Sequence, residues 1–204
     1  MGGAIYLEGA HSNLISKNDL DKASIGLAFG SHDNTVAANS VSGSGGVALT
    51  YGAHGNEIKG NAITGGGIGI FASSGNVIVG NDISASPTFG IGVHGSCHFG
   101  RSDENALVRN TVRGSAGDGI AVAASDNYPH PCPGPRGNAI IENKVDAGND
   151  DGIDVDSEST VVTKNSTNDN GDLGIEAVPG VIDGGGNRAR GNGNPLQCLY
   201  VVCS

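Results

Sequence analysis

Asparagine pairs separated by four residues recur along the chain, and this spacing constrains the fold more than any other feature. Successive second asparagines are 21, 22, 20, 29, 33, 22 and 27 residues apart. A short apolar segment with period two, such as Ile68-x-Ile70, precedes each pair. A unit near 21 residues with short alternating strands predicts a parallel β-solenoid of about eight coils. The pairs are Asn13/Asn18, Asn34/Asn39, Asn56/Asn61, Asn76/Asn81, Asn105/Asn110, Asn138/Asn143, Thr160/Asn165 and Asn187/Asn192.

Composition supports this interpretation and excludes several classes of protein. The 204 residues include 36 glycines, only 16% are charged, and the net charge is -10. Glycine and asparagine disfavour helix interiors, glycine has no period of three, and no apolar run approaches the ~18 residues of a membrane span. An acidic surface also excludes nucleic acid as a partner, because phosphate binding needs clustered Lys and Arg. We expect stacked asparagines to bond between coils, which is a structural role.

Departures from the repeat point to function. The stretches Gly90–Asn105, Gly119–Asn138 and Gly174–Asn187 take 15, 19 and 13 residues, where plain coils take 8 to 10. Three loops beside the Gly-Ile-x-Val strand predict a groove along it. By alternation, the outward residues of this strand are Tyr6, Ala28, Ala48, Gly69, Gly92, Ala121, Asp154 and Glu176, with a second column of His94, Ala123 and Asp156.

Carboxylates gather at the C-terminal end of this predicted groove. Asp154 and Asp156 share one face of a strand, and Glu176 lies one coil away, about 5 Å from Asp154. Paired carboxylates at this spacing suit glycoside hydrolysis, so Asp154, Asp156 and Glu176 are the candidate catalytic residues. Two alternatives remain open: the carboxylates simply solvate the strand, or a calcium ion binds to Asp150, Asp151, Asp154, Asp156 and Glu158.

Further candidate ligand contacts lie in or beside the insertions. These substrate-binding candidates are His94, Arg101, Asp126, Tyr128, His130 and Arg136. The alternative for the two arginines is pairing with Asp103 or Glu104. A separate column of His11, His32 and His54 precedes the first three asparagine pairs. Stacked imidazoles of this kind suit a divalent metal, or are a turn residue copied as coils duplicated.

The four cysteines form two natural pairs. Cys97 and Cys132 lie in adjacent insertions, and Cys198 and Cys203 bracket a short C-terminal segment. We expect disulfides Cys97–Cys132 and Cys198–Cys203, which fit an oxidising compartment. The alternative for the first pair is a zinc site with His98 and His130, although the spacing matches no strong zinc signature.

The Gly-Ile-x-Val strand followed by Asn-x4-Asn resembles the right-handed parallel β-helix repeat proteins, the group that includes pectin lyases and polygalacturonases. The resemblance covers Gly3 to Gly193, and the ending from Asp172 to Cys203 is similar to secreted bacterial members. Residues 149–156 are similar to the Asp-rich strand of polygalacturonases. However, the His94 motif precedes that strand instead of following it, and no Arg-Ile-Lys motif follows, so that activity is not carried over.

The resemblance implies one domain over residues 1–204, with coils to residue 193 and a C-terminal cap over residues 194–204. Coil one begins without a cap, so we expect an N-terminal continuation or a partner chain there. The expected function is polysaccharide binding in the groove of an extracellular or cell-surface protein. The alternatives are a glycoside hydrolase or a calcium-assisted polysaccharide lyase or epimerase, and a purely structural scaffold.

Overall fold

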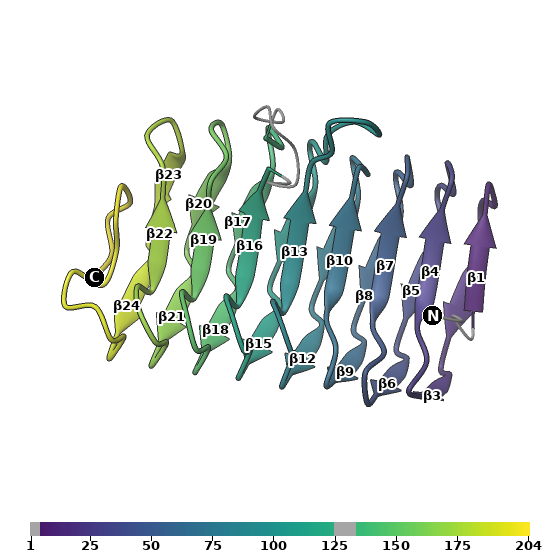
Figure 1. Ribbon diagram of the computed structural model, residues 1–204, viewed down its shortest axis with the longest axis horizontal. Helices are drawn as coiled ribbons and strands as arrows, with labels where there is room; N and C mark the ends of the chain where they lie inside the picture. Colours follow the sequence, from purple (N-terminus) through teal and green to yellow (C-terminus); the bar gives the residue numbers. More distant parts are fainter. Residues whose placement is uncertain (1–4, 125–133) are drawn as a thin grey trace.

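The chain forms a parallel β-solenoid. The computed structural model describes residues 5–124 and 134–204, which contain 24 short strands. These strands form three parallel sheets of eight strands each, and the chain visits the sheets in the same order on every coil. Figure 1 shows the coils side by side along one axis, from β1 to β22. The prediction of about eight coils is confirmed.

The strand bounds repeat with the coils. Sheet 1 consists of β1 (Ile5–Glu8), β4 (Ile25–Ala28), β7 (Val47–Thr50), β10 (Ile68–Phe71), β13 (Ile91–His94), β16 (Ile120–Ala123), β19 (Ile153–Val155) and β22 (Ile175–Ala177). Sheet 2 consists of β2 (Leu14–Ser16), β5 (Thr35–Ala37), β8 (Glu57–Lys59), β11 (Val77–Val79), β14 (Ala106–Val108), β17 (Ala139–Ile141), β20 (Val161–Thr163) and β23 (Ile182–Gly185). Sheet 3 consists of β3 (Asp19–Asp21), β6 (Ser40–Ser42), β9 (Ala62–Thr64), β12 (Asp82–Ser84), β15 (Thr111–Arg113), β18 (Lys144–Asp146), β21 (Ser166–Asn168) and β24 (Arg188–Arg190).

The core is built by the apolar residue that alternation turns inward on each strand. Ile68 and Ile70 of β10, Ile78 of β11 and Ile83 of β12 are all fully buried within one coil. Burying each such side chain contributes about 1.5–3 kcal/mol. Because every coil repeats the pattern, the core is a continuous column. No helix long and apolar enough to cross a membrane occurs in the described part of the chain.

Asparagine ladders join the coils at two corners, as the sequence predicts. The first asparagines of the pairs form the first ladder, and the second asparagines form the second ladder. Asn56 is typical: its Oδ1 accepts hydrogen bonds from both the backbone N–H and the side-chain Nδ2 of Asn34, each 3.0 Å long. The Asn34 amide also donates to the Ala10 carbonyl at 2.9 Å. Asn34 and Asn56 are both 1% exposed, so these bonds satisfy groups that water does not reach.

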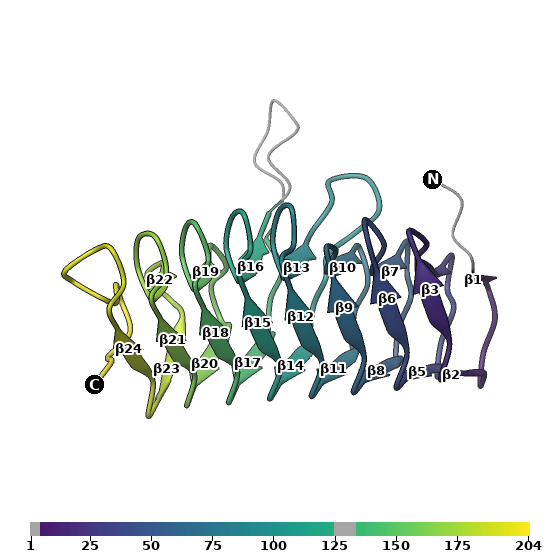
Figure 2. The ribbon, with the colours of Figure 1, turned by 90° about the horizontal axis from the view of Figure 1, so that it is seen from below.

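The last predicted asparagine pair has the wrong register. Asn187 accepts from the N–H of Asn165, in the second ladder, and Asn192 accepts from the N–H of Asn170, in a third ladder. The predicted insertion from Gly174 to Asn187 is therefore wrong. β23 follows β22 directly and pairs with β20, with one irregularity between Val162 and Thr163. Two insertions remain, after β13 and after β16, and Figure 2 shows the loop between β13 and β14 extending away from the sheets.

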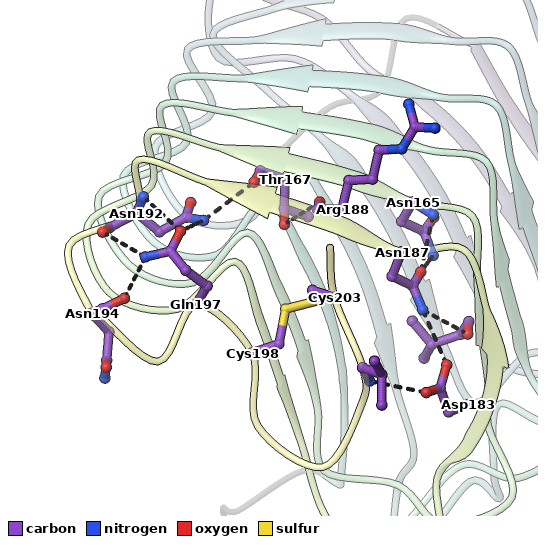
Figure 3. The surroundings of a disulfide bond; sticks show 12 residues. Asn165, Thr167, Asp183, Asn187, Arg188, Asn192, Asn194, Gln197, Cys198 and Cys203 are labelled. Atoms are coloured by element: carbon purple, nitrogen blue, oxygen red, sulfur yellow. Dashed lines mark hydrogen bonds between the residues drawn. A yellow bond between two sulfur atoms is a disulfide. The ribbon is translucent and has the colours of Figure 1, made fainter.

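The C-terminal segment folds back over the last coil. Cys198 and Cys203 form the disulfide that the sequence predicts. Gln197 continues the third ladder, because its Oε1 accepts from the side-chain amide of Asn192 at 2.9 Å (Figure 3). Val201 is 8% exposed and packs into the core. The predicted Cys97–Cys132 bond involves a residue outside the described ranges, so this pairing stays a prediction.

Candidate functional site

Small side chains dominate the outward face of sheet 1. The strand register places Tyr6, Gly26, Ala48, Gly69, Gly92, Ala121, Asp154 and Glu176 in one column. Ala28 was predicted in this column, but it pairs with Glu8 and Thr50 in the neighbouring column and is 1% exposed. The register follows from Ile5 pairing with Ile25, which keeps the inward apolar residues aligned.

A pocket of about 250 Å³ opens beside this column, where the turns lead from sheet 3 into sheet 1. Glycine makes its floor possible: a Cβ at Gly66 would lie 1.6 Å from the carbonyl oxygen of Gly45 in the preceding coil. Gly69 differs, since a Cβ there would meet nothing within 4 Å. The lining residues are Ser24, Ser44, Gly45, Gly46, Val47, Ala48, Gly66, Gly67, Gly69, Ser86, Pro87, Thr88 and Phe89.

The same turns carry carboxylates in later coils. Phe89, Asp118 and Asp151 each stand directly before the glycine that precedes a sheet 1 strand. The backbone N–H of Asp151 donates to Asp118 Oδ1 at 3.2 Å, and the N–H of Leu173 donates to Asp151 Oδ1 at 2.7 Å. Successive coils are about 4.8 Å apart, so the pocket wall at Phe89 lies one coil from Asp118.

The acidic cluster, as we name it, joins these turn residues to the carboxylates of sheet 1. It consists of Asp118, Asp150, Asp151, Asp154, Asp156 and Glu176. Asp154 and Glu176 are register partners on β19 and β22, as the sequence predicts. Burial, and then repulsion from Asp156, Asp118, Glu176 and Asp150, raises the pKa of Asp154 to about 7. Asp154 is therefore about half protonated near pH 7.

Asp151 is the most enclosed member of the acidic cluster, with 5% of its surface exposed. Burial raises its pKa to about 8, opposed by the hydrogen bond from Leu173 and reinforced by Glu176. The neighbouring Glu176 carboxyl group raises the pKa of Asp151 further, because two carboxyl groups so close together resist ionising at the same time. Burial is also the main reason why the pKa of Asp118 is raised. The cluster thus stores protons at a pH where isolated carboxyl groups are ionised.

Three members of the acidic cluster have the geometry of cation ligands. One carboxylate oxygen from each of Asp118, Asp150 and Asp151 lies within 4.8 Å of the other two. Oxygen ligands of this kind suit a hard cation such as calcium. This set differs from the predicted calcium set: within the described residues, Asp154, Asp156 and Glu158 do not join it. Glu158 instead lines a second pocket of about 250 Å³.

The predicted substrate contacts fall in different places. His94 lies on β13, with its ring centroid 5.0 Å from that of Phe89, at the wall of the first pocket. Arg136 lines the second pocket with Asp156, and its backbone N–H donates to Asp103 at 2.7 Å. Arg101 lies in the loop after β13, where its carbonyl accepts from Ser74. The remaining candidates, Asp126, Tyr128 and His130, lie outside the described residues.

Sequence reasoning missed Asp118 and assigned Asp151 only to a metal. Both stand in turns, where the alternation used to select outward residues does not apply. A signal was present, because each aspartate immediately precedes a glycine and an isoleucine, in Asp118-Gly119-Ile120 and Asp151-Gly152-Ile153. Aligning coils on this glycine would have placed the two carboxylates next to each other.

Comparison with known proteins gives matches at the level of the fold. A family described as "Periplasmic copper-binding protein (NosD)" matches residues 2–98, slightly under half of the chain. No curated protein sequence matches significantly.

Three solved structures are similar. The periplasmic alginate epimerase AlgG has 14% identity and a TM-score of 0.55, covering 98% of this chain and 47% of that one. The catalytic domain of GH87 α-1,3-glucanase in complex with nigerose has 13% identity and a TM-score of 0.59, covering 98% and 45%. The Azotobacter vinelandii mannuronan C-5 epimerase AlgE6 A-module has 14% identity and a TM-score of 0.51, covering 98% and 64%. This chain thus spans somewhat less than half of the first two structures and less than two thirds of the third. The chain has the parallel β-helix fold of these solved structures.

Proposed function

We propose that this protein binds an uncharged polysaccharide along sheet 1, between the pocket at Phe89 and the acidic cluster. One observation carries the proposal: the pocket wall and the first carboxylate of the cluster occupy the same turn position in successive coils. An extended ligand lying across the coils would therefore contact both. Between them, the Phe89 and His94 rings lie over Gly92 of β13, where a Cβ would collide with both rings.

The chemistry of this surface suits a sugar chain. The exposed hydroxyl groups of Ser44 and Thr88 offer hydrogen-bonding groups, and the Phe89 ring offers an apolar face. The similar solved structures are alginate and mannuronan epimerases and an α-1,3-glucanase, which act on polysaccharides. An extracellular or periplasmic location follows for a protein with such a ligand and a disulfide.

The negative charge of the protein favours uncharged polysaccharides over anionic ones. The net charge is -10, and the acidic cluster adds closely spaced carboxylates at one end of the surface. A polyuronate would be repelled there unless a cation neutralised it. Uncharged glucans and similar chains meet no such repulsion and can accept hydrogen bonds from protonated carboxyl groups.

The pocket can be filled without disturbing the fold. A side chain at Gly69 enters open space, so Gly69→Leu should preserve the melting temperature and abolish retention in affinity electrophoresis with uncharged polysaccharides. The matched control is Ala62→Leu, which adds the same group to an exposed position on β9 of sheet 3. Equal retention by both variants and the unmodified chain would refute binding in this pocket, as would retention by polyuronates alone.

A second candidate function, glycoside hydrolysis, is favoured by the raised pKa of Asp154. A carboxyl group protonated near pH 7 can protonate a glycosidic oxygen, and Glu176 in the next coil can serve as nucleophile or base. Activity should then fall as the pH rises through about 7, because the acid loses its proton. Asp154→Asn should lower turnover about 100-fold or more while retention persists.

Product analysis separates the alternatives. The assay measures reducing ends and unsaturated products from neutral and uronate polysaccharides, with and without calcium. Unsaturated products that need calcium would support a lyase in place of a hydrolase. Retention without any product would leave binding as the function and refute hydrolysis.

A further inference from the structure

Four aromatic rings gather at the corner where the chain leaves sheet 1. Phe29 and Tyr51 directly follow β4 and β7, and their rings stack with centroids 5.1 Å apart and an interplanar angle of 23°. Phe71 of β10 meets Tyr51 edge-on at 5.9 Å, and Phe99 of the loop after β13 meets it at 4.7 Å. Phe29 is 54%, Tyr51 36% and Phe99 60% exposed. We name these four residues the aromatic column.

The insertion after β13 brings Phe99 to the column from two coils away. Ser96 and Gly100 close a tight turn through two backbone hydrogen bonds of 2.8 and 3.2 Å. The backbone N–H groups of His98 and Phe99 both donate to Ser96 Oγ at 3.3 Å. Figure 1 shows this loop leaning from β13 toward β10. Because Phe99 itself stays largely exposed, the insertion enlarges the aromatic surface and does not bury it.

Packing in the core does not account for Phe29 and Tyr51. Both rings lie outside the core that residues 5–124 and 134–204 form. Their backbone φ angles are 49° and 53°, in the left-handed region that bulky residues rarely adopt. Gly9 has the same position in the first coil, with a φ of 55°, and glycine is the residue that this conformation favours. An exposed aromatic side chain kept on such a backbone points to a ligand.

Gly9 also leaves one face of Phe29 open. The rings of Phe29 and Tyr51 stack at about one coil spacing, so their faces are turned along the solenoid axis. Gly9 lies one coil before Phe29, because its N–H donates to the Ala28 carbonyl at 3.2 Å. A Cβ at Gly9 would meet, among the described residues, only the Phe29 carbonyl oxygen, at 3.7 Å. The face of Phe29 turned away from Tyr51 therefore borders a space about one ring thick.

We propose that the open face of Phe29 binds a glucose ring of a β-linked glucan, in the space beside Gly9. All substituents of a β-glucose ring are equatorial, so both of its faces present C–H groups, which the negative face of an aromatic ring attracts. Glu8 directly precedes Gly9 and is exposed, and its carboxylate can accept hydrogen bonds from the sugar hydroxyl groups.

The class of ligand in this proposal rests on the proposed function, but the place of binding does not. Tyr51 lies three residues beyond Ala48, which lines the pocket at Phe89. In an extended strand this separation is about 10 Å. The aromatic column and the pocket are thus on opposite sides of sheet 1 and can be tested independently.

Calorimetric titration of the full chain with cellohexaose and with laminarihexaose tests the proposal. The unmodified chain should bind at least one of the two. Phe29→Ala and Phe29→Leu should each weaken binding about tenfold or more, because leucine keeps apolar area without a flat face. Phe29→Tyr should keep the affinity. In nuclear magnetic resonance, saturation of the aromatic protons should transfer to the sugar C–H protons, and Phe29→Leu should lose most of this transfer.

Gly9→Asn tests the open space itself. Asparagine tolerates a positive φ, and its side chain would occupy the place of the sugar ring, so binding should fall about tenfold or more. Gly60→Asn is the matched control, because Gly60 is exposed, has a φ of 59° and lies at the corner between sheets 2 and 3. It should leave the affinity unchanged. The thermal transition of each variant checks that it is folded.

Three results would overturn the proposal. These are no binding of either oligosaccharide, equal affinity in Phe29→Leu and the unmodified chain, and dimerisation that Phe29→Ala abolishes, since a second copy would then cover the rings. Gly69→Leu tests the pocket in the same titration. A loss of affinity in Phe29→Leu alone would support the aromatic column and count against the pocket, and a loss in Gly69→Leu alone would do the reverse.

Discussion

Asn138 and Thr160 occupy successive positions of the first asparagine ladder, and the Asn138 side-chain nitrogen and the Thr160 hydroxyl are both buried without a hydrogen-bond partner among the described residues. Elsewhere in this ladder the equivalent nitrogen donates to the Oδ1 of the next asparagine, as Asn105 does to Asn138 at 3.2 Å. Threonine is too short to offer that oxygen. The ladder is thus interrupted at this step.

Thr160→Asn should repair the interruption. The new Oδ1 would accept from the Asn138 amide. The new amide would reach the Pro135 carbonyl, three residues before Asn138, just as the Asn105 amide donates to the Ser73 carbonyl, three residues before Asn76. Satisfying buried groups should stabilise the protein by roughly 1–2 kcal/mol, measured by thermal or denaturant unfolding. Ser40→Asn adds an amide at an exposed position on β6 and should have no such effect. Unchanged stability in Thr160→Asn would contradict this account of the ladder.

Removing an intact rung should have the opposite effect. Asn81 accepts two hydrogen bonds from Asn61 and donates to the Ile58 carbonyl and to Asn110, and it is 1% exposed. Asn81→Ala leaves several buried groups unpaired, so we expect a loss of about 3 kcal/mol or more. Asn13→Ala, at an exposed rung in the first coil, should cost clearly less. Similar losses for the two variants would show that burial does not determine the value of a rung.

The acidic cluster should make stability depend on pH. Because the pKa of Asp151 rises from 3.8 to about 8 on folding, its contribution is fully present below pH 4 and is lost as the pH rises through about 8. Asp151→Asn keeps the Oδ1 that Leu173 needs but cannot ionise. The variant should match the unmodified protein near pH 4 and exceed it by at least about 1.4 kcal/mol near pH 9, the equivalent of one pKa unit. Parallel pH curves for the two proteins would refute the raised pKa.

The C-terminal disulfide should stabilise the last coil. Cys198 and Cys203 are five residues apart, and closing so short a loop is worth about 2 kcal/mol in the chain-entropy description. Cys203→Ser should therefore lower the free energy of unfolding by about that amount. Hydrogen exchange should increase first at the amides of Leu199 and Gly174, which bond between this segment and β22. Exchange that increases equally in all coils would argue against a local effect.

The fold could be predicted because each coil of a solenoid has the same geometry, so the same residue pattern recurs once per coil. Ile68 and Ile70 face inward and Asn76 and Asn81 turn the corners, and every coil repeats these positions with the same spacing. The register of the last coil could not be obtained in this way. Asn165 and Asn170 are also five positions apart, so the same spacing matches two registers, and only hydrogen bonds between coils distinguish them.

The candidate site was predictable on strands and not in turns. Asp154 and Glu176 follow from alternation, because parallel pairing puts equivalent strand residues side by side. Asp118 and Asp151 depend on how a turn of one coil lies on the next, which a period of two does not encode. The pKa of Asp151 depends further on the hydrogen bond from Leu173, which lowers it, and on Glu176, which raises it; both residues come from the following coil.

Gln197 limits how a second copy of the chain can pair with the C-terminal end of the solenoid. Its longer side chain occupies the amide acceptor and donor positions that a further asparagine would use, and residues 197–199 already pair with the edge of β22. A second copy of the chain approaching this end would find the edge of sheet 1 and the third ladder already saturated. Pairing with a second copy at the edge of sheet 1 and at the third ladder is therefore blocked by residues 197–199.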